Sequence, residues 1–269
     1  MKLINIFRRS KYKNFLKRLT ARLVGSYKVD IKDKHFFVKY SSFWENVNNG
    51  NWEPSTFYIF DKFIDKEHSF IDIGAWIGPT TLYGSQIAKK CYAIEPDPVA
   101  FYELKKNINL NPNLKSRINI YELCISDKCG KIRLGNRNNF GDSMSSILLN
   151  DLNKTLFVQS LTLQEFILQN KIDDCNFIKI DIEGGEAIVL PQIKEFLEKN
   201  KPTIHLSLHP SLFKDIESYS KLITKTLKIY ENIFDHEGES LTANNALLNF
   251  LLKPQKGADI VATDRSWNN

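Results

Sequence analysis

The sequence predicts an α/β fold built on a mostly parallel sheet. From about residue 69, short apolar runs alternate with longer segments of helical periodicity, which is typical of successive strand–helix–strand units. A glycine-marked turn, "GAWIG", directly follows the first apolar run, and the second run ends in "EPDP", an acid followed by a proline-led helix start. In open α/β sheets such turns lie at the carboxyl ends of the strands, where ligands bind.

Each element can be assigned in chain order. Strands are expected at "SFIDIG", "CYAIEP", "INIYELCIS", "NFIKIDIEGGE" and "TIHLSLHP", with "GKIRL" as a hairpin partner beyond the third. Helices are expected after Pro79, after Asp97, around residues 189–197 and in "SLFKDIESYSKLITKTLKIY". The last two strands are expected at "NIFDHEG" and "ALLNFLLKP", as an antiparallel pair at the end of the sheet. Residues 136–155 are polar and turn-rich, and predict a loop long enough to cover a site.

Three parts of the chain are expected: a basic, helical N-terminal extension (1–50), the α/β domain (51–254) and a polar, poorly ordered tail (255–269). Between Met1 and Lys28 there are nine basic residues and no acidic one. The rest of the chain has 28 basic and 31 acidic residues, a net charge of −3, although the whole chain is +6. The basic segment could lie on an anionic membrane surface or bind an acidic partner, or it could pack on the domain with its charges in solvent.

The sequence predicts a cytoplasmic protein, with peripheral contact at the inner face of the membrane if the basic segment binds lipid. No apolar run approaches the roughly 18 residues of a membrane span, and the N-terminus lacks the pattern of a signal peptide. The four cysteines form no C-x-x-C pair and have no histidines at zinc-ligand spacing, so we expect free thiols.

The first turn excludes the common nucleotide ligands. Trp76 stands where a dinucleotide-binding turn needs its second glycine, and the chain has no G-x-x-x-x-G-K-[ST] loop. Asp72 ends the first strand, and Glu95 ends the second, where a carboxylate can accept hydrogen bonds from both ribose hydroxyls. A ligand with a ribose, a positive charge and no phosphate fits these residues, and S-adenosylmethionine (SAM) meets all three requirements.

The combination of motifs resembles the FkbM family of SAM-dependent methyltransferases. The matching segments cover about residues 69–200 and are "FIDIGAWIGPTTLYG", "YAIEPDPVAFYELKKNINLN", "ELCISDKCGKIRL", "VQSLTLQEFI" and "FIKIDIEGGEAIVL". The resemblance implies a class I, Rossmann-like methyltransferase fold, with a mostly parallel seven-stranded sheet whose last strand is antiparallel. It also implies O-methylation of a sugar, glycan or natural product. The first 50 residues and the stretch after Pro202 match less closely.

The resemblance further implies the residues of the cofactor site. Those expected in the first turn and at the methionine end are Asp72, Gly74, Trp76, Gly78 and Asp181. Those expected at the ribose and the adenine are Glu95, Pro96, Asp97, Ser126 and Asp127. Among them, Glu95 would hold the ribose.

Methyl transfer to a hydroxyl needs a group that takes the proton, or a metal that acidifies the hydroxyl. The candidates at the ends of the fourth and fifth strands are Lys179, Asp181, Glu183, His205 and His209. His209 is the expected general base, and the alternative is a surface histidine that caps the next helix. Asp181, Glu183 and His209 also suit a divalent metal, but the Glu-Gly-Gly turn alone accounts for these carboxylates, so no metal ligand is assigned.

Three further residues have expected places near the site. Glu186 is expected as an acid in the first turn of a helix. Trp52 and Glu53 are expected at the mouth of the pocket, with core packing as the alternative for Trp52.

Two other functions compete with a sugar- or glycan-directed O-methyltransferase. The basic N-terminus is compatible with nucleic-acid methylation, but the chain has no N-P-P-[YF] signature and no aromatic-basic interleaving along the fold, so no nucleic-acid partner is expected. The other is a non-catalytic scaffold that binds a partner through its N-terminal helix. The intact Asp72 and Glu95 argue against a scaffold, because a degenerate pocket has no physical need for either carboxylate.

Overall fold

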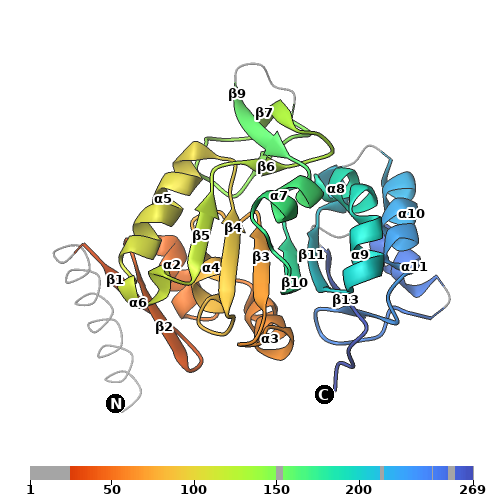
Figure 1. Cartoon of the computed structure of the whole chain (residues 1–269), viewed down its shortest axis with the longest axis horizontal. Helices are drawn as coiled ribbons and strands as arrows, with labels where there is room; N and C mark the ends of the chain where they lie inside the picture. The colour runs from red at the N-terminus through yellow and green to blue at the C-terminus, as the bar shows by residue number, and fades with distance from the viewer. Residues whose placement is uncertain (1–24, 150–153, 213–214, 244, 254–257, 269) are drawn as a thin grey trace, which may run out of the picture.

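The computed structural model describes residues 25–149, 154–212, 215–243, 245–253 and 258–268 (Figure 1). The segment expected to form a basic amphipathic helix lies outside these residues up to position 24. Among the described residues, no helix combines the length and the apolar character that crossing a membrane requires. All four cysteines are free thiols, as predicted.

A seven-stranded sheet runs through the centre of the molecule in the order β12-β13-β11-β10-β3-β4-β5 (Figure 1). Its strands are β3 (Ser69–Ile73), β4 (Lys90–Ile94), β5 (Ile118–Tyr121), β10 (Cys175–Ile180), β11 (Thr203–Leu208), β12 (Asn232–Asp235) and β13 (Ala258–Thr263). Neighbours from β5 to β11 pair in parallel, whereas β13 is antiparallel to both β11 and β12. The predicted mostly parallel sheet with one antiparallel last strand is confirmed.

Helices cover both faces of this sheet, so β3 and β11 are buried at every position. One face packs on α3 (Pro54–Phe63), α4 (Pro79–Gly84) and α5 (Pro98–Asn109), followed by the short α6 (Pro112–Lys115). The other face packs on α7 (Leu163–Gln169), α8 (Glu186–Gln192), α9 (Lys194–Asn200), α10 (Ile216–Leu227) and α11 (Ala246–Leu252). A single 3-10 turn, η2 (Pro210–Leu212), follows β11.

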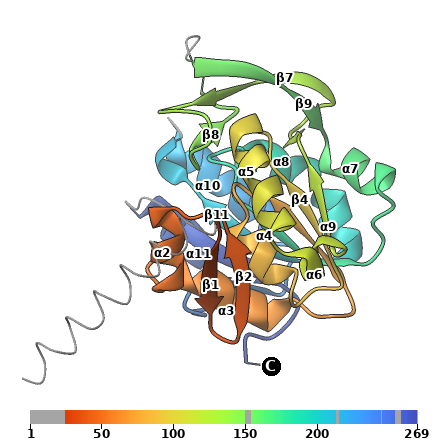
Figure 2. The ribbon, with the colours of Figure 1, turned by 90° about the vertical axis from the view of Figure 1, so that its left-hand side faces the viewer.

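Part of the N-terminal extension is a β-hairpin, so the prediction of a helical extension is wrong over residues 27–38. β1 (Tyr27–Ile31) and β2 (Lys34–Val38) pair antiparallel beside α4 and α5, and α2 (Ser42–Asn48) follows (Figure 2). Buried and exposed positions alternate along β1, which is the two-residue period of a strand with one face on a core. The side chains of Asn107 and Asn111 accept hydrogen bonds from the backbone N–H groups of Lys39 and Phe37 and fix the hairpin to the domain.

Two predictions near the C-terminus are wrong. The apolar run expected as the last strand forms α11, with Leu247 and Leu251 buried one helical turn apart. The antiparallel strand is β13, which lies within the expected polar tail and buries Ile260, Val261 and Ala262. The first error arose because a short apolar run is compatible with either a helix or a strand. The second arose because the three apolar residues of β13 stand close to charged residues, so that the segment has no clear strand pattern in the sequence.

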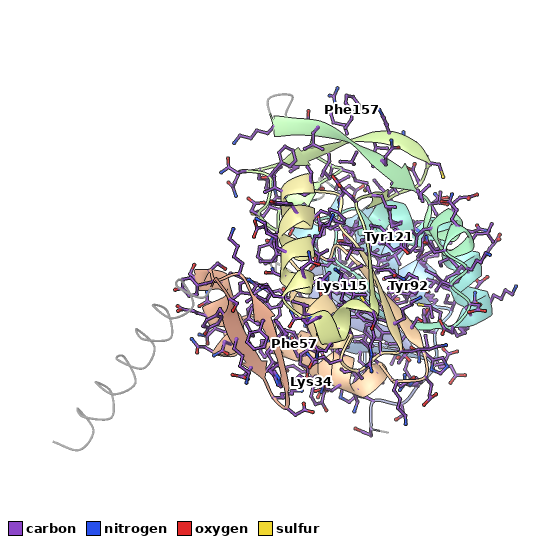
Figure 3. The ribbon with its side chains drawn as sticks, turned by 60° about the vertical axis from the view of Figure 1, so that its left-hand side comes forward. Lys34, Phe57, Tyr92, Lys115, Tyr121 and Phe157 are labelled. Carbon is purple, nitrogen blue, oxygen red and sulfur yellow. The ribbon has the colours of Figure 1, made fainter. Side chains whose placement is uncertain are left out.

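A four-stranded sheet lies above the carboxyl ends of the central strands (Figure 2). It contains β6 (Cys124–Ile125), β7 (Gly130–Asn136), β8 (Ser145–Ser146) and β9 (Thr155–Leu161). Phe157 on β9 lies on its outer side and is 67% exposed (Figure 3). Of the predicted long loop (136–155), residues 136–149 and 154–155 are described, and they contain the β7–β8 connection and β8.

Candidate active site

A cavity of about 220 Å³ lies at the carboxyl ends of β3, β4, β10 and β11, between the central sheet and the β7–β8 loop. One water takes about 30 Å³ in the liquid, so the cavity has room for a small organic molecule. The predicted loop contributes five residues to its wall, in agreement with the prediction that it covers a site: Asp142, Ser143, Ser145, Ser146 and Ile147. The position agrees with the strand ends at which the sequence predicts ligand binding.

The turn after β3 depends on two left-handed residues. Gly74 has a φ of +81°, and a Cβ there would lie 1.8 Å from the backbone oxygen of Asp181. Trp76 has a φ of +48°; its backbone N–H donates to Glu95 Oε2 at 2.8 Å, and its indole Nε1 donates to the Gly141 carbonyl at 2.9 Å. Trp76 thus links the turn, the end of β4 and the covering loop.

Glu95 lies on the cavity wall directly after β4 and is only 6% exposed. Its Oε1 accepts a hydrogen bond from the Asp97 N–H and its Oε2 from the Trp76 N–H, both at 2.8 Å. Each oxygen keeps acceptor capacity for a ligand hydroxyl. Burial raises the pKa of Glu95 to about 8.

A chain of charges joins β3 to β10 at the cavity, with Lys179 and Asp181 on its wall and Asp72 behind it. Asp72 is fully buried, and its Oδ2 accepts hydrogen bonds from the hydroxyls of Thr80 and Thr81. The ammonium of Lys179 is 3.7 Å from Asp72 Oδ1 and 3.2 Å from Asp181 Oδ2. Burial acts to lower the pKa of Lys179, but the carboxylates of Asp181, Asp72 and Glu53 outweigh it and raise that pKa, so the ammonium stays charged.

His209 follows β11 and lies among three carboxylates. Its Nε2 is 3.4 Å from Glu183 Oε1 and 3.9 Å from Asp181 Oδ1, and its Nδ1 is 3.7 Å from Glu186 Oε1. Burial acts to lower the pKa of His209, but Glu186, Asp181 and Glu183 raise it to about 9. The imidazole therefore holds its proton at neutral pH, which works against a role as general base in the free protein. Glu186 lies in the first turn of α8, as predicted.

Most of the predicted site residues meet at this cavity. Those on its wall are Gly74, Trp76, Glu95, Pro96, Lys179, Asp181, Glu183 and His209. Trp52 and Glu53 also line the wall, as expected. Glu53 adopts a left-handed backbone (φ +39°), and burial raises its pKa to about 8.

Six predicted residues do not line this wall: Asp72, Gly78, Asp97, Ser126, Asp127 and His205. Four of the buried ones, Asp72, Gly78, Asp97 and Ser126, have structural contacts that explain their positions. Asp97 caps α5 through the N–H groups of Val99 and Ala100 and holds the covering loop through Gly141 and Ser145. Ser126 hydrogen-bonds to Ser160, while its neighbours Cys124 and Ile125 reach the wall in its place.

Gly78 and His205 are also buried and do not line the cavity. Gly78, at a φ of +100°, starts α4, and a Cβ there would lie 2.7 Å from a methyl group of Leu104. His205 is fully buried, with its Nε2 3.8 Å from Asp259 Oδ1; neither ring nitrogen has a hydrogen-bond partner among the described residues, and burial lowers its pKa to about 4.

Sequence reasoning missed two parts of the wall. Ser143, Ser145 and Ser146 come from the covering loop, where the turn-rich "GDSMSS" was the available signal. Asp259 comes from β13, and no motif marked it because that strand was taken as tail.

The cavity suits a positively charged cofactor without phosphate. Lys179 and His209 are the cationic side chains among the described wall residues, and carboxylates surround both. Glu95 offers carboxylate oxygens to a ribose, and Gly74 leaves the turn without a side chain. These residues fit SAM, which when bound supplies an electrophilic methyl group.

The sheet order and its single antiparallel strand define a class I methyltransferase fold, and the cavity at its strand ends fits SAM. A sequence model of the FkbM methyltransferase domain matches residues 72–230, more than half of the chain. The chain therefore belongs to the FkbM methyltransferase family. No curated protein sequence matches it.

Solved structures similar to this chain include several methyltransferases. Methyltransferase FkbM from Methylobacillus flagellatus is 13% identical with a TM-score of 0.47, over 84% of this chain and 56% of that one. The chain thus spans little more than half the length of that protein. A putative methyltransferase from Streptococcus mutans in complex with SAH is 11% identical with a TM-score of 0.43, over 77% and 95% of the two chains. A tRNA m1G37 methyltransferase from M. jannaschii is 14% identical with a TM-score of 0.39, over 88% and 53%.

Proposed function

We propose that this protein transfers the methyl group of SAM to a hydroxyl of a sugar, glycan or related natural product. The carrying observation is that two groups of polar residues share the cavity wall. The turn after β3 and Glu95 form one group, and Asp181, Glu183 and His209, with ligand atoms within 4.8 Å of one another, form the other. Carboxylates and an imidazole can hydrogen-bond to several hydroxyls at once.

In the proposed cofactor site, Glu95 accepts hydrogen bonds from the ribose hydroxyls. Pro96, Cys124 and Ile125 border the adenine side of the cavity, and Gly74 lies at the methionine end. Asp72 does not contact the cofactor but supports the wall. Its Oδ2 accepts hydrogen bonds from two threonine hydroxyls, and its Oδ1 lies 3.7 Å from the Lys179 ammonium.

The chemical step is an in-line displacement. The acceptor oxygen forms a bond to the methyl carbon while the carbon–sulfur bond breaks, and the sulfur leaves as the neutral thioether of S-adenosylhomocysteine (SAH). Asp181, Glu183 and His209 receive the acceptor hydroxyl, and its proton leaves through this cluster to solvent. Lys179 keeps Asp181 in place. Alignment of the two reacting atoms can lower the barrier by about 7 to 11 kcal/mol.

The proposal is tested by incubating the protein with SAM and a broad panel of sugars and glycans. We expect mass spectrometry to detect a methylated hydroxyl product together with SAH, and a large loss of rate in Glu95→Gln. Calorimetric titration of SAH into the same protein checks the cofactor separately. Tight SAH binding without methylation of any hydroxyl acceptor would refute the acceptor class, and methylation of an oligonucleotide would replace it.

We also propose that residues 1–28 hold the protein at an anionic membrane surface on the cytoplasmic side. The support is their charge, nine basic residues and no acidic one. Because Tyr27 and Val29 are buried in the hairpin, the matched truncation starts at Gly25. Full-length protein should sediment with anionic liposomes and the truncated form should not. Equal sedimentation of the two would end this proposal.

A further inference from the structure

Three side chains from the ends of two neighbouring strands converge on the cavity wall. Asp181 and Glu183 follow β10, and His209 follows β11. One ligand atom from each lies within 4.8 Å of the other two. His209 Nε2 lies 3.4 Å from Glu183 Oε1 and 3.9 Å from Asp181 Oδ1. Oxygens at about 2.1 Å from one small cation lie roughly 3 Å apart, so a small closure of the side chains would complete a site.

A fourth side chain, that of Glu186, faces the other ring nitrogen of His209. Glu186 is fully buried; its Oε1 accepts a hydrogen bond from the Ile182 N–H and lies 3.7 Å from His209 Nδ1. Among the described residues, Glu186 Oε2 and His209 Nδ1 have no hydrogen-bond partner. A carboxylate behind one ring nitrogen, with the other nitrogen facing two carboxylates, is the arrangement that orients metal-binding histidines.

Apart from His209 itself, whose proton a cation would displace, the described wall gives these carboxylates little positive charge. Lys179 is on the same wall, but its ammonium lies against Asp181 Oδ2 and Asp72, whereas His209 faces Asp181 Oδ1. Within the described chain, no lysine or arginine forms an ion pair with Glu183 or Glu186, and Arg137 acts on Glu183 only from further away. Asp259 adds one more carboxylate to the same cavity wall.

We propose that Asp181, Glu183 and His209 bind one divalent cation of the Mg²⁺ or Mn²⁺ type, with Glu186 as the positioning residue of His209. Two carboxylates and one imidazole leave coordination positions for water and for the acceptor. The inference rests on the proposed function in one respect, that the acceptor is a hydroxyl. The cation binds that oxygen and lowers the pKa of the O–H group, so that the proton leaves to water as the oxygen–methyl bond forms and the carbon–sulfur bond breaks.

The test titrates Mn²⁺ into full-length protein, with and without SAH, and follows free Mn²⁺ by electron paramagnetic resonance. We expect saturable binding by the wild type and at least tenfold weaker binding by Glu183→Gln. Glu186→Gln, which removes only the charge behind His209, should weaken binding by roughly tenfold. The matched control Glu217→Gln, an exposed glutamate on α10, should bind Mn²⁺ as the wild type does. Nitrogen hyperfine coupling to bound Mn²⁺ should be present in the wild type and absent in His209→Gln.

SAH calorimetry on each variant shows that it is folded and separates the two proposals. Wild-type protein that binds SAH but not Mn²⁺, or Glu183→Gln that binds Mn²⁺ as tightly as the wild type, would overturn the cation site and leave the methyltransferase proposal standing. Saturable Mn²⁺ binding without nitrogen hyperfine coupling would also overturn the proposed site, because it would show that His209 is not a ligand. Failure to bind SAH would count against the proposed function alone.

Discussion

Gly74 carries the tightest backbone contact of the site. Its left-handed φ and the 1.8 Å approach of a Cβ to the Asp181 oxygen leave no room for any other residue. Gly74→Ala should lower the free energy of unfolding by at least about 3 kcal/mol, through overpacking added to backbone strain. Gly50→Ala is the matched control, because Gly50 has a φ of +71° and open space around it. It should cost about 1 kcal/mol. Equal losses in urea unfolding would show that the close contact is not the cause.

Glu95 gives the site a pH dependence. Burial raises its pKa from near 4.5 to about 8, so between these values the folded protein holds a proton that the unfolded chain has lost. The stability that this group contributes is present below the unfolded pKa and is lost as pH rises through the folded pKa. A ribose needs the ionised form as acceptor, so SAH affinity should rise over the same window.

Calorimetry of SAH at pH 6.5 and pH 8.5 checks this expectation. The dissociation constant of the wild type should fall more than tenfold, which corresponds to about 1.4 kcal/mol or more. Glu95→Gln should bind weakly and lose most of this pH dependence, with Glu53 and His209 as the wall groups that still titrate in this range. A wild-type affinity that does not change with pH would contradict the role of Glu95.

At the level of elements, one side chain joins α5 to the covering loop. Asp97 accepts hydrogen bonds from two N–H groups of α5, from the Gly141 N–H and from the Ser145 hydroxyl. Asp97→Ala should therefore cost about 3 kcal/mol of stability and also weaken SAH binding, because the loop forms part of the cavity wall.

Asp215 supplies the control for Asp97. It caps α10, a helix of the same length as α5, but it is exposed and holds no loop. Asp215→Ala should cost about 1 kcal/mol and leave SAH affinity unchanged. If both variants bind SAH like the wild type, Asp97 is only a helix cap.

The sequence predicted those elements whose signal is local. The strands at the site are continuous apolar runs bounded by glycine, proline or acids, and "DP" before an apolar period marked the start of α5. The first strand of the hairpin lies beside the basic segment, whose charge pattern dominated the interpretation of residues 1–50. The burial of Asp72 could not be predicted, because it depends on Thr80 and Thr81 turning their hydroxyls back onto the strand end.

At the scale of the whole molecule, β13 holds the sheet together. It pairs with β11 on one side and β12 on the other, and it brings Asp259 to the cavity. A chain truncated after Lys253 should lose cooperative unfolding and SAH binding together, because β11 then has an unpaired edge and β12 has no neighbour.

Trp267→Ala provides the comparison for this truncation. It keeps β13 but removes a half-buried ring that packs on Phe63 and Phe234. The variant should fold, bind SAH and lose about 2 kcal/mol, less than the loss of a fully buried aromatic ring. Circular dichroism and urea unfolding distinguish the two outcomes, and a truncated chain that still unfolds cooperatively would contradict the role of β13.

The position of β13 also has a consequence for biosynthesis. A ribosome makes β12 before β13, although β13 lies between β11 and β12 in the finished sheet. During synthesis, the apolar strand β11 therefore exposes the edge that pairs with β13 in the folded protein, and β12 has no strand to pair with. Such an edge is a template for pairing with other chains. The nascent polypeptide is thus most open to aggregation between the release of β11 and the emergence of β13, which is the interval in which a chaperone would protect it.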